Sequence, residues 1–265
     1  MLNAAVNGIN INYQESGQGE PFTLIIGLGS DKSNWRLQTT FFGKHYRIIT
    51  FDNRGSGRSD KPAEPYTIKA MADDTIGLLD HIGIERTHLL GISMGGMIAQ
   101  ELAIRYPERV EKLVLASTFA RREGESGFSE EVSRAVKTWE ASPQGITDTR
   151  RVIDLILDLT FNKLSYRVLA LPLMRTAVRF SSLRGVGEQL RATLGHDVYS
   201  RLPIIQAPTL VITGTADRVI KPSSSEVIAK SIPGSTLVKI EGGSHGLSGE
   251  MSGEFNTYVM SFLKK

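Results

Sequence analysis

The sequence predicts an α/β fold with a mostly parallel central sheet and helices on both faces. Two observations predict it: short apolar, β-branched runs alternate with amphipathic stretches, and 265 residues suffice for one large core. The predicted buried strands are residues 23–26, 46–51, 87–92, 112–117, 209–214 and 236–241. The predicted helices, with apolar residues three and four apart, are residues 68–82, 94–107 and 223–232. Strands that alternate with helices favour parallel pairing, because each crossover helix packs back on the sheet.

The first strands of this sheet depart from that rule. The opening "NAAVNGININYQ" places Asn7 and Gly8 between two alternating runs, and Asn-Gly is a strong signal for a two-residue hairpin. The sheet is therefore expected to begin antiparallel.

A helical insertion interrupts the alternation. Patterns such as "EEVSRAVKTWE" and "RVIDLILDLTF" follow one another without a clear strand, which predicts a core domain of residues 1–118 and 202–265 with a helical cap of residues 119–201. Pro172 should end or kink a helix there, and "LRGVGEQL" offers a hinge-like break. The insertion either completes the core or forms a lid over the carboxyl edge of the sheet, where open α/β sheets bind ligands.

Charge and hydropathy exclude several classes of protein. The net charge is +3, and no basic run is interleaved with aromatic residues, so nucleic acid is not an expected partner. The most apolar stretch, "VLALPLM", has seven residues where a membrane span needs about 18. The first basic residue is Lys32, so no targeting leader is expected and a cytoplasmic location is the default. The chain has no cysteine, which excludes disulfides and a cysteine nucleophile.

One stretch, "LLGISMGGMIA", carries the strongest chemical signal. It places Ser93 between a predicted strand and a predicted helix, where a sharp turn presents the hydroxyl above the sheet edge. Gly91, Gly95 and Gly96 leave room for the close approach of strand and helix that a Cβ would block. Ser93 is therefore predicted to be a nucleophile.

A serine nucleophile needs a base and a group that orients the base. His245 lies in "EGGSHG" after the last predicted strand, and Asp217 ends "TLVITGTAD" after the preceding one. Both loops emerge from the edge that presents Ser93. The other four histidines lie elsewhere in the predicted elements and are expected to be ordinary. The backbone N–H of Met94, first in the helix, is a natural donor for the charge that develops on an attacked carbonyl.

These features resemble the α/β-hydrolase superfamily over essentially the whole chain. The order Ser93, Asp217, His245 is that family's order of nucleophile, acid and base. "IIGLGSDKSNW" resembles its oxyanion loop, "FDNRGSGRSD" its turn after the next strand, and "APTLVITGTAD" its acid-bearing strand. The resemblance implies a second oxyanion donor at the N–H of Leu28. Many relatives carry His where this chain has Ile26.

No cofactor is expected. "GLGSDK" and "GSGRSD" do not complete a dinucleotide-binding motif, and no H-E-x-x-H or similar cluster predicts a metal. Asp52 and Asp60, with Arg54 and Arg58, could be imagined as a charged site. The resemblance makes them a structural turn beneath the active-site loop.

The predicted serine nucleophile limits the classes of reaction that the protein is expected to catalyse. Dehalogenases and epoxide hydrolases of this superfamily use aspartate where this chain has Ser93, so acyl transfer to water is expected, and the leading hypothesis is a carboxylesterase. "PYTIKAMADD" and "GISMGGMIAQELA" also resemble enol-lactone hydrolases of the 3-oxoadipate type, the main alternative. Perhydrolysis is expected only as a side activity. A ligand receptor without turnover is the alternative from another class.

The substrate is expected to be a small ester or lactone, and the oligomeric state stays open. Substrate-binding candidates in the insertion are Trp139, Phe161 and Met174, followed by Tyr166, Leu171 and Phe180. Residues 160–201 hold seven Lys plus Arg against two acids. These cations either meet a carboxylate-bearing substrate or form a solvated helix face.

Overall fold

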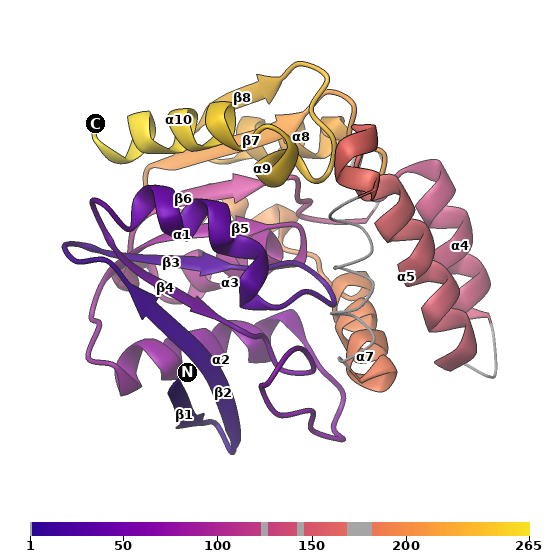
Figure 1. Cartoon of the computed structure of the whole chain (residues 1–265), viewed down its shortest axis with the longest axis horizontal. Coiled ribbons are helices and arrows are strands. Elements are labelled where there is room, and N and C mark those ends of the chain that lie inside the picture. Colours follow the sequence, from indigo (N-terminus) through magenta and orange to yellow (C-terminus); the bar gives the residue numbers. More distant parts are fainter. Residues whose placement is uncertain (1, 123–126, 142–145, 169–181) are drawn as a thin grey trace.

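Eight strands in the described part of the chain form one sheet, in the order β1-β2-β4-β3-β5-β6-β7-β8 (Figure 1). The computed structural model describes residues 2–122, 127–141, 146–168 and 182–265. The strands are β1 (Leu2–Val6), β2 (Ile9–Ser16), β3 (Pro21–Ile25), β4 (Arg47–Phe51), β5 (Thr87–Ile92), β6 (Val110–Ala116), β7 (Thr209–Gly214) and β8 (Thr236–Ile240). The helices outside the insertion are α1 (Arg36–Phe42), α2 (Ile68–His81), α3 (Met94–Arg105), α8 (Pro222–Ser231), α9 (Leu247–Glu250) and α10 (Ser252–Leu263), with short 3-10 turns η1 (Lys32–Trp35), η2 (Pro107–Arg109) and η3 (Tyr199–Ile204).

The sheet begins antiparallel and continues parallel, as the sequence predicts. β1 pairs antiparallel with β2, and Val6 faces Ile9 across a two-residue loop. In that loop Asn7 has φ 49° and Gly8 has φ 77°, the left-handed conformations that this hairpin turn requires. β2 also runs antiparallel to β4, whereas every later neighbouring pair is parallel.

Helices cover both faces of the sheet and bury two hydrophobic clusters. Neighbouring residues of one strand point to opposite faces: Leu89 packs in the cluster under α2 and α3, and Leu90 in the cluster that contains Phe255 of α10. All six residues of β5 are buried. Burial on both faces explains why the central parallel strands are continuous apolar runs rather than alternating ones, whereas the edge strand β8 is mostly not buried.

Three described helices of the core, α1, the four-residue α9 and α10, were missing from the sequence prediction. α1 lies beside α10 on one face of the sheet (Figure 1). Phe255, Val259 and Leu263 recur every four residues in α10 and are all buried, so the periodic signal for this helix was present.

The segment between β6 and β7 is mostly helical in its described residues. It holds α4 (Glu130–Glu140), α5 (Ile146–Thr160) and α7 (Leu183–Leu194), which lie toward the carboxyl ends of the parallel strands (Figure 1). Pro172, predicted to break a helix, lies outside the described residues. That residues 119–201 form a separate cap domain stays a prediction.

The hinge predicted at "LRGVGEQL" is wrong. These residues open the continuous helix α7, which is capped by the Ser182 side chain on the Gly185 N–H. A Cβ on Gly185 would lie 2.6 Å from the Gly55 carbonyl oxygen. Gly185 therefore allows two backbones to touch, which keeps α7 on the loop after β4.

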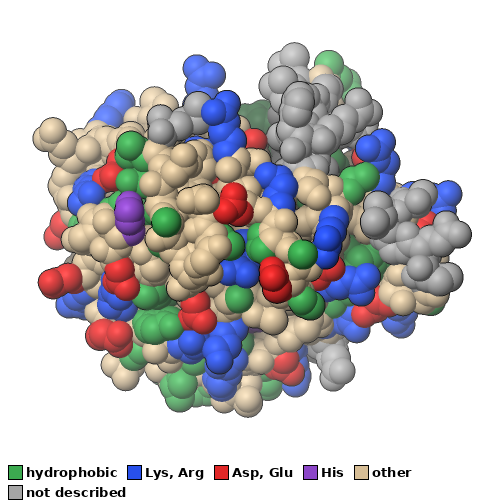
Figure 2. Space-filling model, turned by 90° about the horizontal axis from the view of Figure 1, so that it is seen from below, with side chains coloured by type: hydrophobic (Ala, Val, Ile, Leu, Met, Phe, Trp, Pro, Cys, Tyr) green, Lys and Arg blue, Asp and Glu red, His purple; other side chains and the backbone are tan. Residues whose placement is uncertain are grey.

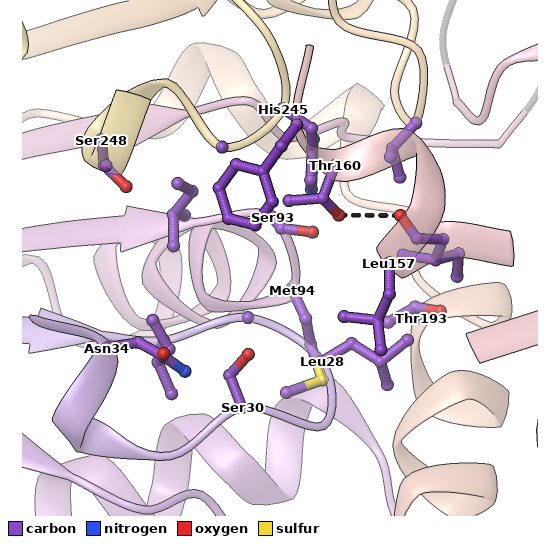
Figure 3. A pocket seen from close by; sticks show the side chains of 18 of the residues that line it. Leu28, Ser30, Asn34, Ser93, Met94, Leu157, Thr160, Thr193, His245 and Ser248 are labelled. Atoms are coloured by element: carbon purple, nitrogen blue, oxygen red, sulfur yellow. Dashed lines mark hydrogen bonds between the residues drawn. The ribbon is translucent and has the colours of Figure 1, made fainter. Parts of the chain in front are cut away.

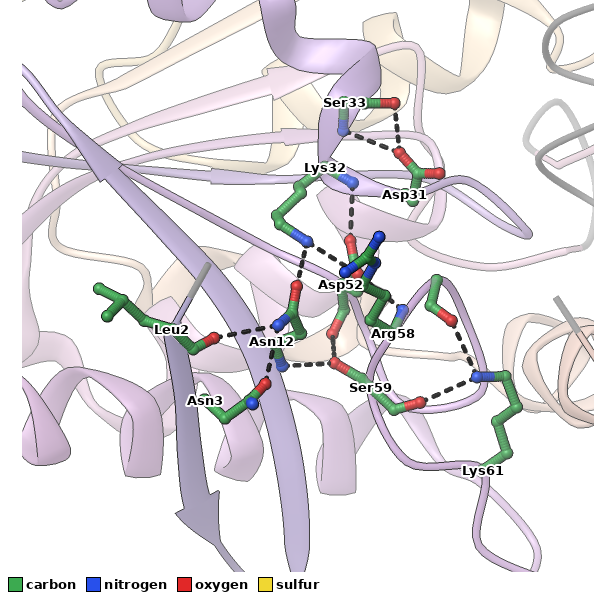
Figure 4. Close-up of polar contacts among 11 residues, drawn as sticks. Leu2, Asn3, Asn12, Asp31, Lys32, Ser33, Asp52, Arg58, Ser59 and Lys61 are labelled. Atoms are coloured by element: carbon green, nitrogen blue, oxygen red, sulfur yellow. Dashed lines mark hydrogen bonds and ion pairs between the residues drawn. The ribbon is translucent and has the colours of Figure 1, made fainter. Parts of the chain in front are cut away.

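The loop after β4 is a structural turn, in agreement with the sequence prediction (Figure 4). Asp52 is buried and accepts hydrogen bonds from the Lys32 N–H (2.9 Å), the Lys32 ammonium (3.0 Å) and the Arg58 N–H (2.9 Å). The Ser59 hydroxyl donates to the Asp52 carbonyl at 2.6 Å, and the Asp60 carboxylate accepts from the Asn10 N–H at 2.8 Å. The carboxylates of this loop thus hold the backbone in place.

The face in Figure 2 shows acidic and basic side chains dispersed among each other. Within the described ranges, no helix combines the length and the apolar character that a membrane crossing requires.

Candidate active site

Ser93 occupies a strained turn between β5 and α3. Its φ of 56° and ψ of −123° are unfavourable for a residue with a side chain. The Ser93 N–H donates to the Ala116 carbonyl at 2.9 Å, and its carbonyl accepts from the Thr118 hydroxyl at 2.8 Å. The end of β6 and the residues after it therefore hold this backbone in place, and strain of this kind concentrates at functional sites.

The glycines beside Ser93 are required by contact between backbones. A Cβ on Gly91 would lie 2.2 Å from the Gly95 carbonyl oxygen, and one on Gly95 would lie 2.0 Å from the Ile25 carbonyl oxygen. Both distances are far below van der Waals contact. The predicted close approach of strand and helix is confirmed.

Asp217 and His245 follow β7 and β8 and are joined by a hydrogen bond. The His245 Nδ1 lies 2.9 Å from Asp217 Oδ2. The other oxygen, Oδ1, accepts from the backbone N–H groups of Val219 (2.8 Å) and Ile220 (2.9 Å). Because a carboxylate only accepts, Nδ1 carries the hydrogen and Nε2 is left as an acceptor. Both side chains are buried.

The loop that carries His245 is fixed to the end of α5 and the residues after it. The Gly246 N–H donates to the Thr160 carbonyl at 2.8 Å. Buried Glu250 accepts the Lys163 N–H at 2.7 Å and bonds the Ser244 hydroxyl. The insertion therefore contacts the histidine loop directly.

Ser93 and His245 line one cavity of about 250 Å³ at the carboxyl edge of the sheet. In Figure 3 His245 lies above Ser93, while Leu28 and Met94 lie below it. Asp217 is not among the lining residues and lies behind His245. Other lining residues come from the loop after β3, α5, α7 and α9, among them Ile26, Gly27, Ser30, Leu157, Thr160, Thr193 and Ser248.

The backbone of Gly27 and Leu28 lies against Ser93. A Cβ on Gly27 would sit 3.2 Å from the Ser93 Cβ and 3.7 Å from its Oγ. Met94 is the first residue of α3, and the first N–H groups of a helix have no partner within it. Leu28 follows Gly27, which lies next to Ser93 in space, and Met94 follows Ser93 in the chain. The two predicted oxyanion donors therefore belong to residues next to Ser93, and both residues line the cavity.

The substrate-binding candidates separate into three groups. Phe161 and Tyr166 line the cavity, and the Tyr166 hydroxyl donates to the Gly249 carbonyl at 2.8 Å. Trp139 was predicted wrongly: it is 3% exposed in the core, its indole N–H donates to Thr149 Oγ1 at 2.8 Å, and it is absent from the described cavity lining. Met174, Leu171 and Phe180 lie outside the described residues.

No Lys, Arg, Asp or Glu lies among the described residues that line the cavity. The described basic side chains of residues 160–201 that make polar or ring contacts do so elsewhere: Lys163 with the Glu250 carbonyl, Arg184 with the Ala63 carbonyl, Arg191 with the Trp139 ring, and Arg201 with Glu101. Those four side chains therefore do not line the cavity, and Arg175 and Arg179 of this basic segment lie outside the described residues. No group of three or more His, Asp or Glu suited to a metal ion occurs in the described ranges.

Sequence reasoning missed Gln189 of α7. Its side chain is fully buried and bonds Gly29 and Ser56. Those partners are more than 130 positions away in sequence, so no local pattern signals the contact.

Fold and site together define a hydrolase with a serine on the strand-to-helix turn. The family described as "alpha/beta hydrolase fold" matches residues 20–250, and the chain belongs to this family. The resemblance drawn from the motifs is thereby confirmed.

Named relatives support hydrolysis and differ in substrate. The chain is 30% identical to 3-oxoadipate enol-lactonase 2 of Acinetobacter baylyi, over 97% of this chain and 94% of that protein. It is 29% identical to a putative carbamate hydrolase of Yersinia enterocolitica, over 96% and 90% respectively. The crystal structure of the enol-lactonase from Burkholderia xenovorans LB400 superposes with a TM-score of 0.88, at 31% identity and 100% coverage of both chains.

Proposed function

We propose that this protein is a serine hydrolase that cleaves carboxylic esters of small molecules through Ser93, His245 and Asp217. One observation carries the proposal. A strained serine shares a cavity with a histidine whose far nitrogen is hydrogen-bonded to a buried carboxylate. This arrangement can turn a weak hydroxyl into a nucleophile.

The first half of the reaction forms an acyl-enzyme. The Ser93 oxygen attacks the acyl carbon as His245 Nε2 takes the hydroxyl proton, and Asp217 stabilises the imidazolium through Nδ1. The N–H groups of Leu28 and Met94 bind the oxyanion. When the intermediate collapses, the bond between acyl carbon and leaving oxygen breaks, and His245 gives its proton to the leaving alcohol.

The second half uses water in place of the serine. His245 removes a proton from water, the hydroxide attacks the acyl carbon, and Ser93 leaves with the proton returned by His245. The products are a carboxylic acid and regenerated enzyme. A loss of one oxyanion donor typically lowers kcat by about a hundredfold or more.

The cavity favours an uncharged substrate. Its described walls carry hydroxyl, amide and apolar groups and no fixed cation. A carboxylate transferred there without a partner would cost several kcal/mol or more. We therefore assign neutral esters, with neutral lactones as intramolecular esters, as the substrate class.

An enol-lactonase is the second candidate, favoured by the two enol-lactonases to which the chain is about 30% identical. The enol-lactone of a dicarboxylic acid keeps one free carboxylate. Among the described lining residues no Lys or Arg is present to pair with that carboxylate, whereas Arg175 and Arg179 lie outside the described residues.

The test is steady-state hydrolysis of p-nitrophenyl esters of increasing acyl length, alkyl methyl esters, neutral lactones, and an enol-lactone with a free carboxylate beside its methyl ester. We expect wild type to turn over and Ser93→Ala to lose at least about a thousandfold in kcat. We expect the neutral member of the enol-lactone pair to be preferred at least about tenfold, because an unpaired buried carboxylate costs well over 1.4 kcal/mol.

Controls separate the alternatives. Ser165→Ala, at an exposed serine after α5, should retain wild-type turnover. A fluorophosphonate should label the peptide that contains Ser93 in wild type and not in Ser93→Ala. Preference for the free carboxylate would favour the enol-lactonase. Saturable ligand binding without turnover of any ester or lactone would favour a receptor and sink the esterase proposal.

A further inference from the structure

Gln189 connects the helical insertion to the oxyanion loop, here defined as residues 26–30. The Gln189 Oε1 accepts the Gly29 N–H at 2.8 Å. Its Nε2 donates to the Arg54 carbonyl at 2.7 Å and to the Ser56 hydroxyl at 2.7 Å. The side chain is 0% exposed, so these bonds form without competition from water.

The peptide that carries the Leu28 N–H lies between two anchored peptides. On one side the Asn53 amide donates to the Ile26 carbonyl at 3.0 Å. On the other side Gln189 holds the Gly29 N–H. The Gly27 carbonyl belongs to the same peptide group as the Leu28 N–H, and it accepts a long hydrogen bond from the Ser30 N–H at 3.4 Å. Because this bond is long, the orientation of the Leu28 N–H depends mainly on the two neighbouring anchored peptides.

We propose that Gln189 is a positioning residue for the reaction. It holds the oxyanion loop so that the Leu28 N–H points at the oxygen of the tetrahedral intermediate. The inference rests on the proposed function, because it concerns the donor that this function requires. Preorganised donors lower the barrier because they need no reorganisation when charge develops.

An amide suits this place because it accepts and donates while staying neutral. The amide oxygen accepts a hydrogen bond from the Gly29 N–H, and the amide NH₂ donates to the Arg54 carbonyl and the Ser56 hydroxyl. Methionine has a similar shape and offers no comparable hydrogen bond. The insertion therefore contributes to catalysis as well as to the cavity wall, since α7 carries this amide.

The experiment compares Gln189→Met with wild type on the best neutral ester, with active sites counted by fluorophosphonate titration. We expect kcat per active site to fall by about tenfold to a hundredfold, which does not exceed the decrease in kcat caused by removing one oxyanion donor completely. We expect KM to change by less than about twofold. The inhibition constant of an alkyl boronic acid, whose adduct with serine places an anionic oxygen in the oxyanion hole, should rise by the same factor as kcat falls.

Gln100→Met is the matched control. Gln100 is also 0% exposed and donates to a backbone carbonyl, that of Phe119, at 3.2 Å. It has no hydrogen bond to the oxyanion loop among the described contacts. We expect Gln100→Met to lower the melting temperature and to leave kcat per active site and boronic acid affinity within about twofold of wild type.

If Gln189→Met does not fold, Gln189→Asn takes its place, because it keeps the amide and is one methylene too short to reach the Gly29 N–H. A wild-type kcat per active site in the folded variant, or equal losses in Gln100→Met, overturns the role of Gln189 while the esterase proposal stands. Turnover that persists in Ser93→Ala, or none in wild type, overturns the proposed function itself, and the role of Gln189 with it.

Discussion

At the scale of single residues, the site depends on how Asp217 divides its two oxygens. One oxygen faces His245, and the other is held by two backbone N–H groups. This division fixes the carboxylate and makes it an oriented acceptor. In the proposed mechanism Asp217 therefore acts through His245 and does not need to reach the cavity.

The substitution Asp217→Asn tests this arrangement. The asparagine side chain would keep the shape and would still accept backbone N–H groups, yet its NH₂ would favour the wrong histidine tautomer. We expect kcat to fall by about 10³- to 10⁴-fold with an intact fold, measured by steady-state kinetics beside circular dichroism.

The control for that change is Asp197→Asn. Asp197 is exposed, and its carboxylate accepts the N–H of Tyr199 at 3.1 Å in a similar local turn. Wild-type kcat is expected there. An Asp217→Asn variant with more than about a tenth of wild-type kcat would show that another group orients His245.

At the scale of elements, the site is built where β5, α3 and the end of β3 touch. The backbones of Gly91, Gly95 and Ile25 approach so closely that side chains are excluded. The glycines are therefore part of the geometry that presents Ser93.

Gly95→Ala should disrupt this contact. A Cβ there would lie 2.0 Å from a carbonyl oxygen, so β3 and α3 must separate. We expect the free energy of unfolding, measured by urea denaturation, to fall by about 1–3 kcal/mol or more, with loss of activity in the folded fraction.

Gly253→Ala is the matched substitution in an open place. Gly253 lies in α10, and a Cβ there would meet nothing within 4 Å. We expect a gain of up to about 1 kcal/mol, because alanine is the better helix former. Equal effects of the two alanines would contradict the close-contact explanation.

At the scale of the whole molecule, a buried histidine makes stability depend on pH. His196 follows α7, is 5% exposed and packs near the Phe119 ring. Burial, together with nearby Arg201, lowers the pKa of His196 to about 3. In the unfolded chain the His196 side chain takes up a proton near pH 6.5. Between about pH 6.5 and about pH 3 the unfolded state therefore binds more protons than the native state.

The free energy of unfolding should therefore fall as pH drops below about 6.5, by about 1.4 kcal/mol per pH unit from this residue alone. Urea denaturation of wild type and His196→Leu from pH 7.5 to 5.0 measures the contribution. Wild type should lose stability relative to the leucine variant as pH falls, because leucine takes up no proton. Parallel curves would show that His196 titrates normally in the native state.

The turn at Ser93, the loops that carry Asp217 and His245, and the alternation of strands and helices were predictable from local signals. These signals are the spacing of glycines, apolar runs and the position of a residue directly after a strand. Each involves only a few consecutive residues, and backbone sterics and hydrophobic periodicity are determined over the same short range. In the insertion, the same signals could not distinguish residues of the hydrophobic core from residues that line the cavity. Trp139 and Phe161 look alike in sequence, yet one is core and the other lines the cavity.

The fold class, the family and the order Ser93, Asp217, His245 follow from the amino-acid sequence alone. Three features emerge only in the folded chain: Gln189 reaches Gly29 across 160 positions, the histidine loop is bonded to the Thr160 carbonyl through the Gly246 N–H, and the described cavity lining carries no Lys or Arg. The features predicted from sequence depend on secondary-structure propensity and backbone strain, which are set by residues that are neighbours in the chain. Hydrogen bonds and burial belong to neighbours in space, which the packing of α5 and α7 against the sheet edge brings together.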